Sequence, residues 1–445
     1  MNFCSVYVPV GVPTYHLETA QDQFERSCAM LRSVDENVVC PDEMLLTMDK
    51  LRAFLDCVQP DLVIFQNLTF ANAAYMSEVL RRFSCPMLLW TLREPVIDGG
   101  RLRLNSLTGA YSAANALAAF NGRAFNWAFG APEEASVVAA VRASVEAAKI
   151  KKAMKTLTMA AIGHTPQGFG FGRALDSELM NTFGVELEAI EARELIERAK
   201  TYSDEECAAY LAETERCTCG LDKTPEKNKL DHARLLKAYS DYVREHHIGA
   251  LASRCWPDFF TSFGTPVCTV LSMLNDEGVA AACEADVYGA LSMWIGMQLS
   301  HEPVFFGDPV AMDESESSIT YWHCGAAACS LARRDTGAVV GVHPNRKIGP
   351  AMDFGCEAFP EATIFRIGRK PDGSFRFFIA EGAAMDKPKQ FIGTSIVVRT
   401  ERPSREVVEE SIRAGFEPHF VVLKGHHAET LKVLAEMFGF EVCRW

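Results

Sequence analysis

The first third of the chain alternates short apolar runs with longer segments of helical periodicity. The runs CSVYVPVG (4–11), PDLVIFQN (60–67) and CPMLLWTL (85–92) are rich in aliphatic and aromatic residues, as strands are. Between them, 18–34 and 71–83 carry apolar residues at helical spacing. The order β-α-β-α-β predicts a parallel sheet covered by helices on both faces.

The pattern changes twice further along the chain. A second α/β stretch begins at LTMAAIGHTPQGFGFG (157–172), whose glycines match no phosphate-loop spacing and therefore predict a flexible loop. Beyond about residue 315 the segments are short and strand-like, and KPDGSFRFF (370–378) has an Asp-Gly turn typical of a hairpin. We expect an α/β fold with two Rossmann-like or flavodoxin-like parallel-sheet domains and a β-rich C-terminal domain, with boundaries at 1–155, 156–300 and 301–445.

Composition narrows the class of protein. With 445 residues the chain is too long for one ordinary core. No apolar run is long enough for a membrane span, and MNFCSVYVPVG predicts a first strand rather than a signal peptide, so a cytoplasmic protein is expected. A net charge of −14 argues against nucleic acid as a partner. Of the 15 cysteines only Cys217 and Cys219 are close together, which argues against a structural zinc site.

An apolar run that ends in acids supplies the first candidate chemistry. VAAACE (279–284) is expected to be a strand ending at Glu284, followed by an amphipathic helix, and PVFFGD (303–308) a neighbouring strand ending at Asp308. If the two strands lie side by side in a βαβ unit, their acids meet at one edge of the sheet. Two such carboxylates repel unless a cation lies between them, so the pattern predicts a divalent metal. Asp286 is a weaker candidate, because a helix start favours an acid for its own reasons.

Two histidines stand at strand ends in the same part of the chain. His323 ends SITYWH (318–323), and His419 begins HFVVLKG (419–425). The pair His426 and His427 is the alternative to His419, although both lie beyond the expected strand. Imidazole added to carboxylates favours Mn²⁺ or another transition metal over Mg²⁺.

Several segments together resemble the L-fucose isomerase-like family of sugar isomerases, which is related more distantly to the L-arabinose isomerases. The resemblance runs through most of the chain, in VPVGVPTYHLETAQDQF (8–24), PQGFGFGRALDSELMNTFGVELEAIEARELI (166–196), RCWPDFF (254–260), VCTVLSMLNDEGVAAACEADVYGALSMWI (267–295) and WHCG (322–325).

The resemblance implies an aldose–ketose isomerase that acts on an open-chain sugar through a cis-enediol. Glu284 and Asp308 would be metal ligands and acid/base groups, with His419 and, from the arabinose branch, His323 as further ligands. The cofactor would be Mn²⁺, or Mg²⁺ or Co²⁺, acting as a Lewis acid on the sugar oxygens. A homo-oligomer, a trimer or hexamer, is also implied, with a small-molecule sugar and neither nucleic acid nor membrane as partner.

Candidate substrate-binding residues are Arg254 and Trp256, beside the predicted site, and Gln66 and Asn67, at the end of the second strand. Arginine, together with the basic segment HPNRKIG (343–349), would favour an anionic sugar, either phosphorylated or sulfonated. Two other hypotheses stay open. One is a metal-dependent sugar lyase or epimerase that uses the same enediolate chemistry. The other is a non-catalytic sugar-binding protein, since paired α/β domains also suit that role.

Overall fold

The computed structural model describes residues 3–120 and 124–445, which divide into two compact units. The first unit comprises Met1–Ala153 together with Glu429–Glu441, and the second comprises Met154–Ala428 with Val442–Trp445. The predicted boundary near residue 155 falls close to this division, but 154–428 clusters as one unit. A further division of this unit at residue 300 stays a prediction.

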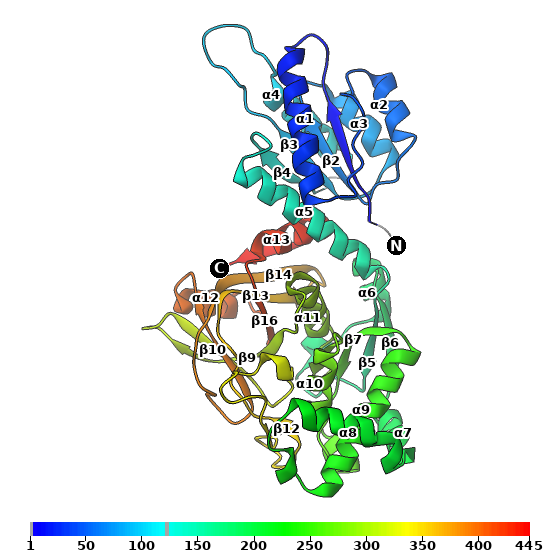
Figure 1. Cartoon of the computed structure of the whole chain (residues 1–445), viewed down its shortest axis with the longest axis vertical. Coiled ribbons are helices and arrows are strands. Elements are labelled where there is room, and N and C mark those ends of the chain that lie inside the picture. Colours follow the sequence, from blue (N-terminus) through cyan, green and yellow to red (C-terminus); the bar gives the residue numbers. More distant parts are fainter. Residues whose placement is uncertain (1–2, 121–123) are drawn as a thin grey trace. The chain divides into compact units, whose positions relative to one another are not determined.

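A four-stranded parallel sheet forms the centre of the first unit, in the order β1-β2-β3-β4 (Figure 1). Its strands are β1 (Ser5–Val10), β2 (Leu62–Asn67), β3 (Met87–Thr91) and β4 (Asn126–Phe129). The helices are α1 (Leu17–Val34), α2 (Met48–Leu55), α3 (Ala73–Arg82), α4 (Ser106–Ala119), α5 (Ala135–Met154) and α13 (Ala428–Phe438).

Alternate residues of these strands enter two separate cores. Val6, Val8 and Val10 of β1 pack with residues of α2, α3 and α4, whereas Tyr7 faces the opposite core with α1 and α5. A strand that is covered on both faces needs apolar residues at almost every position, and β1 is buried throughout. The prediction of a doubly covered parallel sheet is therefore confirmed.

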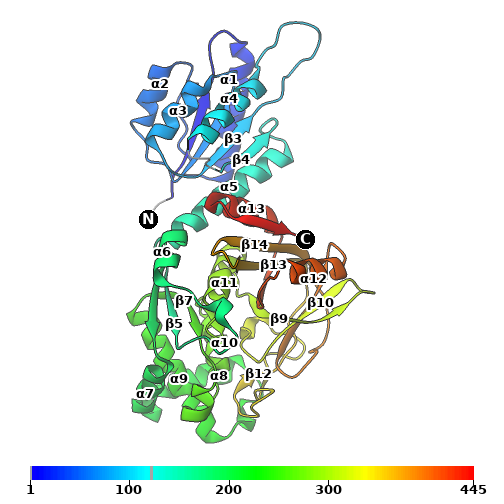
Figure 2. The same ribbon diagram turned by 180° about the vertical axis from the view of Figure 1, so that it is seen from behind.

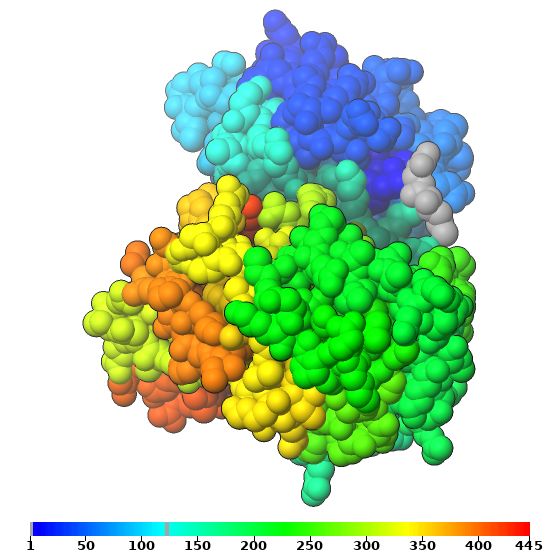
Figure 3. Space-filling view, turned by 60° about the horizontal axis from the view of Figure 1, so that its bottom comes forward, coloured from blue at the N-terminus to red at the C-terminus, as the bar shows by residue number. Residues whose placement is uncertain are grey.

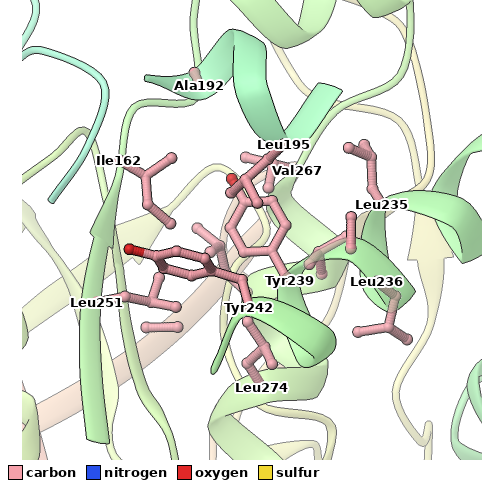
Figure 4. Close-up of a cluster of buried hydrophobic side chains, with 14 of the residues drawn as sticks. Ile162, Ala192, Leu195, Leu235, Leu236, Tyr239, Tyr242, Leu251, Val267 and Leu274 are labelled. Atoms are coloured by element: carbon pink, nitrogen blue, oxygen red, sulfur yellow. The ribbon is translucent and has the colours of Figure 1, made fainter. Parts of the chain in front are cut away.

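The second unit contains another four-stranded parallel sheet, in the order β6-β5-β7-β8. The strands are β5 (Thr158–Ile162), β6 (Glu186–Ile190), β7 (Ile248–Ser253) and β8 (Ala280–Cys283), and the helices α6 (Asp176–Phe183), α7 (Ala192–Thr201), α8 (Asp204–Cys217), α9 (Glu226–Glu245), α10 (Cys268–Asp276) and α11 (Val287–Ser300). Apolar side chains of α7, α9 and α10 converge on β5 and β7, with Tyr239 and Tyr242 at the centre (Figure 4). Residues of α8, drawn in green, lie at the surface in Figure 3, whereas α9 is largely buried.

Six further strands of the second unit close into an antiparallel barrel, which Figure 2 shows from behind. Its order is β13-β16-β9-β10-β15-β14, and β14 pairs back with β13. The strands are β9 (Phe305–Asp313), β10 (Ser318–His323), β13 (Phe359–Arg369), β14 (Phe375–Ala384), β15 (Thr394–Thr400) and β16 (Phe420–Lys424). Strand β17 (Glu441–Arg444) lies beside β14, α12 (Ser404–Arg413) precedes β16, and β11 (Val340–Gly341) pairs with β12 (Ala351–Met352). The predicted hairpin at Asp372-Gly373 is confirmed by the pairing of β13 with β14.

Helix α11 separates the parallel sheet from the barrel. It packs on β7 and β8 on one side and on β13 and β16 on the other. Twelve of its 14 residues are buried, so the prediction of an amphipathic helix is wrong. A helix between two layers has no wet face and needs no polar one. The βαβ interpretation is also wrong, because β8 belongs to the parallel sheet and β9 to the barrel.

Within the described residues, no helix combines the length and apolar character needed to cross a membrane.

Candidate active site

The carboxylate of Glu284 leaves the carboxyl edge of the parallel sheet at a strained turn. Glu284 and Ala285 follow β8 directly and have φ values of 58° and 55°. The left-handed region costs a non-glycine residue about 1 kcal/mol or more, so two such residues in succession are uncommon. The turn is fixed by the Ala285 amide, which donates a hydrogen bond to the Ser253 carbonyl of β7 at 3.1 Å.

Three neighbouring barrel strands supply the other candidate groups. Asp308 lies on β9 opposite Trp322 of β10, and His323 is the last residue of β10. Strand β16 pairs with β9 so that Phe420 lies opposite Gly307. Continuing this antiparallel register by one residue places His419 opposite Asp308. The sequence predicted that Glu284 and Asp308 end neighbouring strands of one sheet. They come from different sheets instead, and Asp308 lies inside β9, which continues to Asp313. Their role as site residues stays a prediction.

The side chains of these residues meet around the His419 imidazole. Its Nε2 lies 3.1 Å from Glu284 Oε2 and 3.7 Å from Asp308 Oδ1. The His323 ring is 5.4 Å away from the His419 ring, centre to centre. One ligand atom from each of Glu284, His323 and His419 lies within 4.8 Å of the other two. Both histidines are buried, while a third of the Asp308 side chain is exposed.

The far side of the His419 ring is held by Asp286. His419 Nδ1 lies 3.1 Å from Asp286 Oδ2. Arg366 of β13 donates to both oxygens of Asp286, at 2.5 and 3.2 Å, and to the His419 carbonyl at 3.1 Å. Asp286 Oδ1 also accepts from the Gly289 amide at the start of α11. The orientation of the imidazole is therefore set by a buried carboxylate–guanidinium pair, an arrangement common behind metal-binding histidines.

The site attracts positive charge. Burial lowers the pKa of His419, but its hydrogen bonds to Asp286 and Glu284 outweigh burial and raise this pKa to about 10. Burial raises the pKa of Glu284, but the hydrogen bond with His419 outweighs burial and keeps this pKa below its usual value. His323 behaves differently, since burial and the neighbouring His419 lower its pKa and leave it neutral. Without a metal, a proton on His419 supplies the positive charge between the acids.

These residues fit a divalent metal. Adjacent ligands of a six-coordinate cation with bonds of ~2.1 Å are about 3 Å apart. Glu284 Oε2 and His419 Nε2 are 3.1 Å apart, and the donors of Glu284, His323 and His419 lie within 4.8 Å of one another. The buried Nδ1 of His323 has no hydrogen-bond partner among the described residues, as expected for a nitrogen that is available to bind a metal ion. A possible metal site is thus present where the sequence predicted one. The choice of manganese over magnesium or cobalt stays a prediction.

The other predicted residues lie in two places. Arg254 and Trp256 follow β7, at the same sheet edge as Glu284. Gln66 and Asn67 end β2 in the first unit, where both side chains are fully buried. Gln66 accepts a hydrogen bond from the Tyr7 hydroxyl and donates one to Ser27 Oγ at 3.1 Å. That any of these four candidates binds the substrate stays a prediction.

The alternative ligands His426 and His427 lie beyond β16. His426 Nδ1 is 3.3 Å from Glu381 Oε1, and His427 Nε2 is 3.0 Å from the Lys424 carbonyl. Neither belongs to the cluster of possible metal ligands found among the described residues. The geometry therefore favours His419.

Sequence reasoning missed Arg366 and two aromatic residues of the site. Phe171, in the predicted flexible loop, and Phe306 of β9 both contact the His419 ring, at centroid distances of 6.2 and 4.7 Å. The signal for Arg366 was available: it is the one charged residue in the apolar run ATIFRIG (362–368), and a charge within a buried strand requires a partner.

Comparison with known proteins gives one consistent result. The chain is 61% identical over 435 residues to a sulfoquinovose isomerase of Clostridium sp. (strain MSTE9), covering 98% of this chain and 97% of that protein. It is 35% identical over 448 residues to the sulfoquinovose isomerase of Priestia aryabhattai, with 99% and 98% covered. A third, from Alkalicoccus urumqiensis, is 34% identical over 440 residues, with 98% of each chain covered. No protein-family model matches the chain.

An α/β fold with an acid–histidine cluster, taken with these relatives, defines the class as a sugar isomerase, as the sequence predicted. The chain belongs to the sulfoquinovose isomerase family. Membership of the L-fucose isomerase-like family stays a prediction, because no family model supports it.

Proposed function

We propose that this protein is a metal-dependent aldose–ketose isomerase that converts sulfoquinovose, a 6-sulfonated aldose, into the corresponding ketose. The relatives named for this activity match nearly the full length of the chain. The observation that carries the reaction type is the convergence of Glu284 and Asp308 on His419 Nε2.

The reaction moves one proton between C1 and C2 of the open-chain sugar. A divalent cation held by Glu284, Asp308, His323 and His419 would polarise the carbonyl that acidifies this proton. Glu284 and Asp308 are the groups able to accept and return the proton. Burial of His323 and His419, with Glu284 half-buried beside them, restricts water around the enediol. Since the two acids belong to different layers, they approach a bound sugar from different directions.

The direct test is incubation of the Mn²⁺-loaded protein with sulfoquinovose in D₂O. Formation of the ketose, detected by NMR and mass spectrometry, with no fragments from carbon–carbon cleavage, supports the isomerase. Cleavage products would favour the lyase hypothesis, and a C2 epimer without ketose the epimerase.

A matched pair of variants separates catalysis from sugar binding. Glu284→Gln keeps the size of the side chain but removes both the base and a charged metal ligand, so at saturating Mn²⁺ kcat should fall by ~10²–10⁴-fold while the protein still binds the sugar. Glu302→Gln is the control, because Glu302 is exposed and paired with Lys424, away from the cluster. No turnover by the wild type with any divalent metal would leave only the sugar-binding hypothesis.

We extend the proposal to the metal and the assembly as the resemblance implies them: Mn²⁺ as the preferred ion, a homo-oligomer, and a cytoplasmic protein. Metal analysis of the purified protein and its mass in solution test the first two.

A further inference from the structure

A group of cationic side chains lies beside the predicted metal site and takes no part in holding it. Arg254 follows β7 as Glu284 follows β8, and these two strands are paired, with Ser253 opposite Cys283. The side chains of Arg254 and Glu284 therefore leave the same sheet edge on adjacent strands. One brings a positive charge and the other a candidate acid/base.

The aliphatic part and the Nε of Arg254 are held by neighbouring residues, whereas its two terminal nitrogens are not. Its Nε donates to the Trp256 carbonyl at 3.0 Å and lies 3.1 Å from Asp258 Oδ2. Its aliphatic part packs on Gly163, where an added Cβ would come within 3.2 Å of the Arg254 Cβ. The two terminal nitrogens of the guanidinium make no hydrogen bond with any described residue. A quarter of the side chain is exposed, so these nitrogens can meet a ligand.

A second arginine reaches the same place from the segment between β11 and β12. The Arg346 guanidinium lies 5.3 Å from the centre of the Trp256 ring. Arg346 and the adjacent Lys347 are exposed, and within the described parts of the chain neither forms an ion pair. Since the chain carries 58 acidic against 44 basic residues, unpaired neighbouring cations are informative.

His343 links this segment to the metal site. It is buried, and its Nδ1 accepts the amide hydrogens of Asn345 and Arg346, both at 3.3 Å. Burial, together with Arg346 and Lys347, lowers the pKa of His343 to about 4, while Glu284 acts in the opposite direction. The basic segment and Glu284 are therefore both close enough to His343 to influence its charge.

We propose that Arg254 and Arg346, which both contact Trp256, form the subsite that binds the sulfonate of the substrate. This rests on the proposed function. A sulfonate carries a permanent negative charge on three oxygens, and guanidinium groups pair with such oxygens through two parallel hydrogen bonds. The sulfonate is attached to C6, the end of the sugar opposite to the reacting C1 and C2. A cationic subsite beside, and separate from, the metal ligands matches that arrangement.

The test compares Arg254→Met, Arg346→Met and the double variant with the wild-type, Mn²⁺-loaded full chain. We expect each single variant to raise KM for sulfoquinovose at least tenfold, while kcat stays within threefold. The neutral sugar 6-deoxyglucose, in which hydrogen replaces the sulfonate, serves as a competitive inhibitor. Its inhibition constant should change less than twofold, and so should the Mn²⁺ dissociation constant measured by titration calorimetry.

Arg216→Met is the control for loss of one positive charge, because Arg216 is an exposed residue of α8 paired with Glu213. Arg216→Met should change neither the KM for sulfoquinovose nor the inhibition constant of 6-deoxyglucose. If Arg254→Met fails to fold, Arg346→Met decides, since that side chain is exposed.

Two results overturn the subsite. One is an unchanged KM for sulfoquinovose, and the other is a parallel weakening of sulfoquinovose and 6-deoxyglucose. A wild type that does not convert sulfoquinovose at all would instead overturn the proposed function. The two failures are thereby distinguished.

Discussion

Asp286 and Arg366 form an ion pair in which each side chain is only 1% exposed. The pair joins the start of α11 to strand β13, 80 residues later, and the same Asp286 oxygen, Oδ2, that accepts from Arg366 also contacts the His419 imidazole. Burial disfavours the charged Asp286, but Arg366 and His419 hold the pKa of this carboxyl well below its usual range. The pair is therefore fully charged in the interior and depends on both partners.

Replacing Arg366 by Met should lower the free energy of unfolding by about 3–5 kcal/mol, because Asp286 is left as an uncompensated buried charge. Urea unfolding of the metal-free protein measures this. The double variant Arg366→Met/Asp286→Asn should recover part of the loss. Arg369→Met, three residues along the same strand in a half-buried pair with Glu178, should cost about 1 kcal/mol or less. Equal losses for both arginines would contradict the assigned role of Arg366.

Asp286→Asn should weaken Mn²⁺ binding by ~10–100-fold. Because it also leaves Arg366 as an unpaired buried charge, the affinity is measured under conditions where circular dichroism shows the variant to be folded. Asparagine can still accept the Gly289 amide at the helix start, but it has no charge with which to orient His419. Titration calorimetry gives the dissociation constant. Asp313→Asn, at the exposed end of β9, should leave it unchanged. An unaltered affinity in Asp286→Asn would mean that packing alone orients the imidazole.

Removal of metal should lower the melting temperature, and its return should restore it. At a free Mn²⁺ concentration 100 times the dissociation constant, binding adds about 2.7 kcal/mol to the stability of the folded state. Glu284→Gln should lose most of this increment, because it removes a charged ligand. His426→Gln should keep it in full. Loss of the increment in His426→Gln alone would transfer the ligand role from His419 to the rival histidine.

The free energy of unfolding should also decrease as the pH is lowered, because of one residue outside the active site. His232 of α9 is fully buried, its Nε2 is 3.0 Å from Thr214 Oγ1, and burial lowers its pKa to about 4. Between pH ~6.5 and 4 the unfolded chain binds a proton here that the folded chain does not, so unfolding becomes easier as the pH falls. The maximum effect is about 3 kcal/mol.

Urea unfolding at pH 7.5 and 5.0 measures this dependence. His232→Gln should reduce the difference between the two pH values, while His16→Gln, an exposed residue before α1, should not. The same pH dependence in both variants would assign the effect to other groups.

The sequence revealed individual strands better than their partners. Apolar runs located β8, β9, β10 and β16, although β9 continues beyond its expected end at Asp308 to Asp313, and β16 begins one residue after His419. Pairing was misjudged because an apolar strand looks the same whether its neighbour is parallel or antiparallel. The order Glu284–helix–Asp308 suggested one sheet, whereas β9 turns into the barrel.

Asp286 shows a second limit. Its position before α11 predicted a helix cap, and Oδ1 does accept the Gly289 amide. Its other oxygen faces Arg366 and His419, which are 80 and 133 residues away in the sequence. The helix-cap pattern accounts fully for the contact with Gly289, so nothing in the local sequence indicates the contacts with Arg366 and His419. Contacts over such separations depend on how the layers are assembled.

Helix α11 has a consequence for how this enzyme can evolve. Because the helix fills the space between sheet and barrel, its thickness sets how far Glu284 stands from the histidines. A methyl group at Gly289 would come within 2.6 Å of the Phe306 ring, and one at Gly296 within 3.3 Å of Val421. Substitutions at these interior positions would therefore change the distances between Glu284 and the histidines without altering any reactive group. Selection on the reaction therefore also acts on side chains that no substrate ever meets.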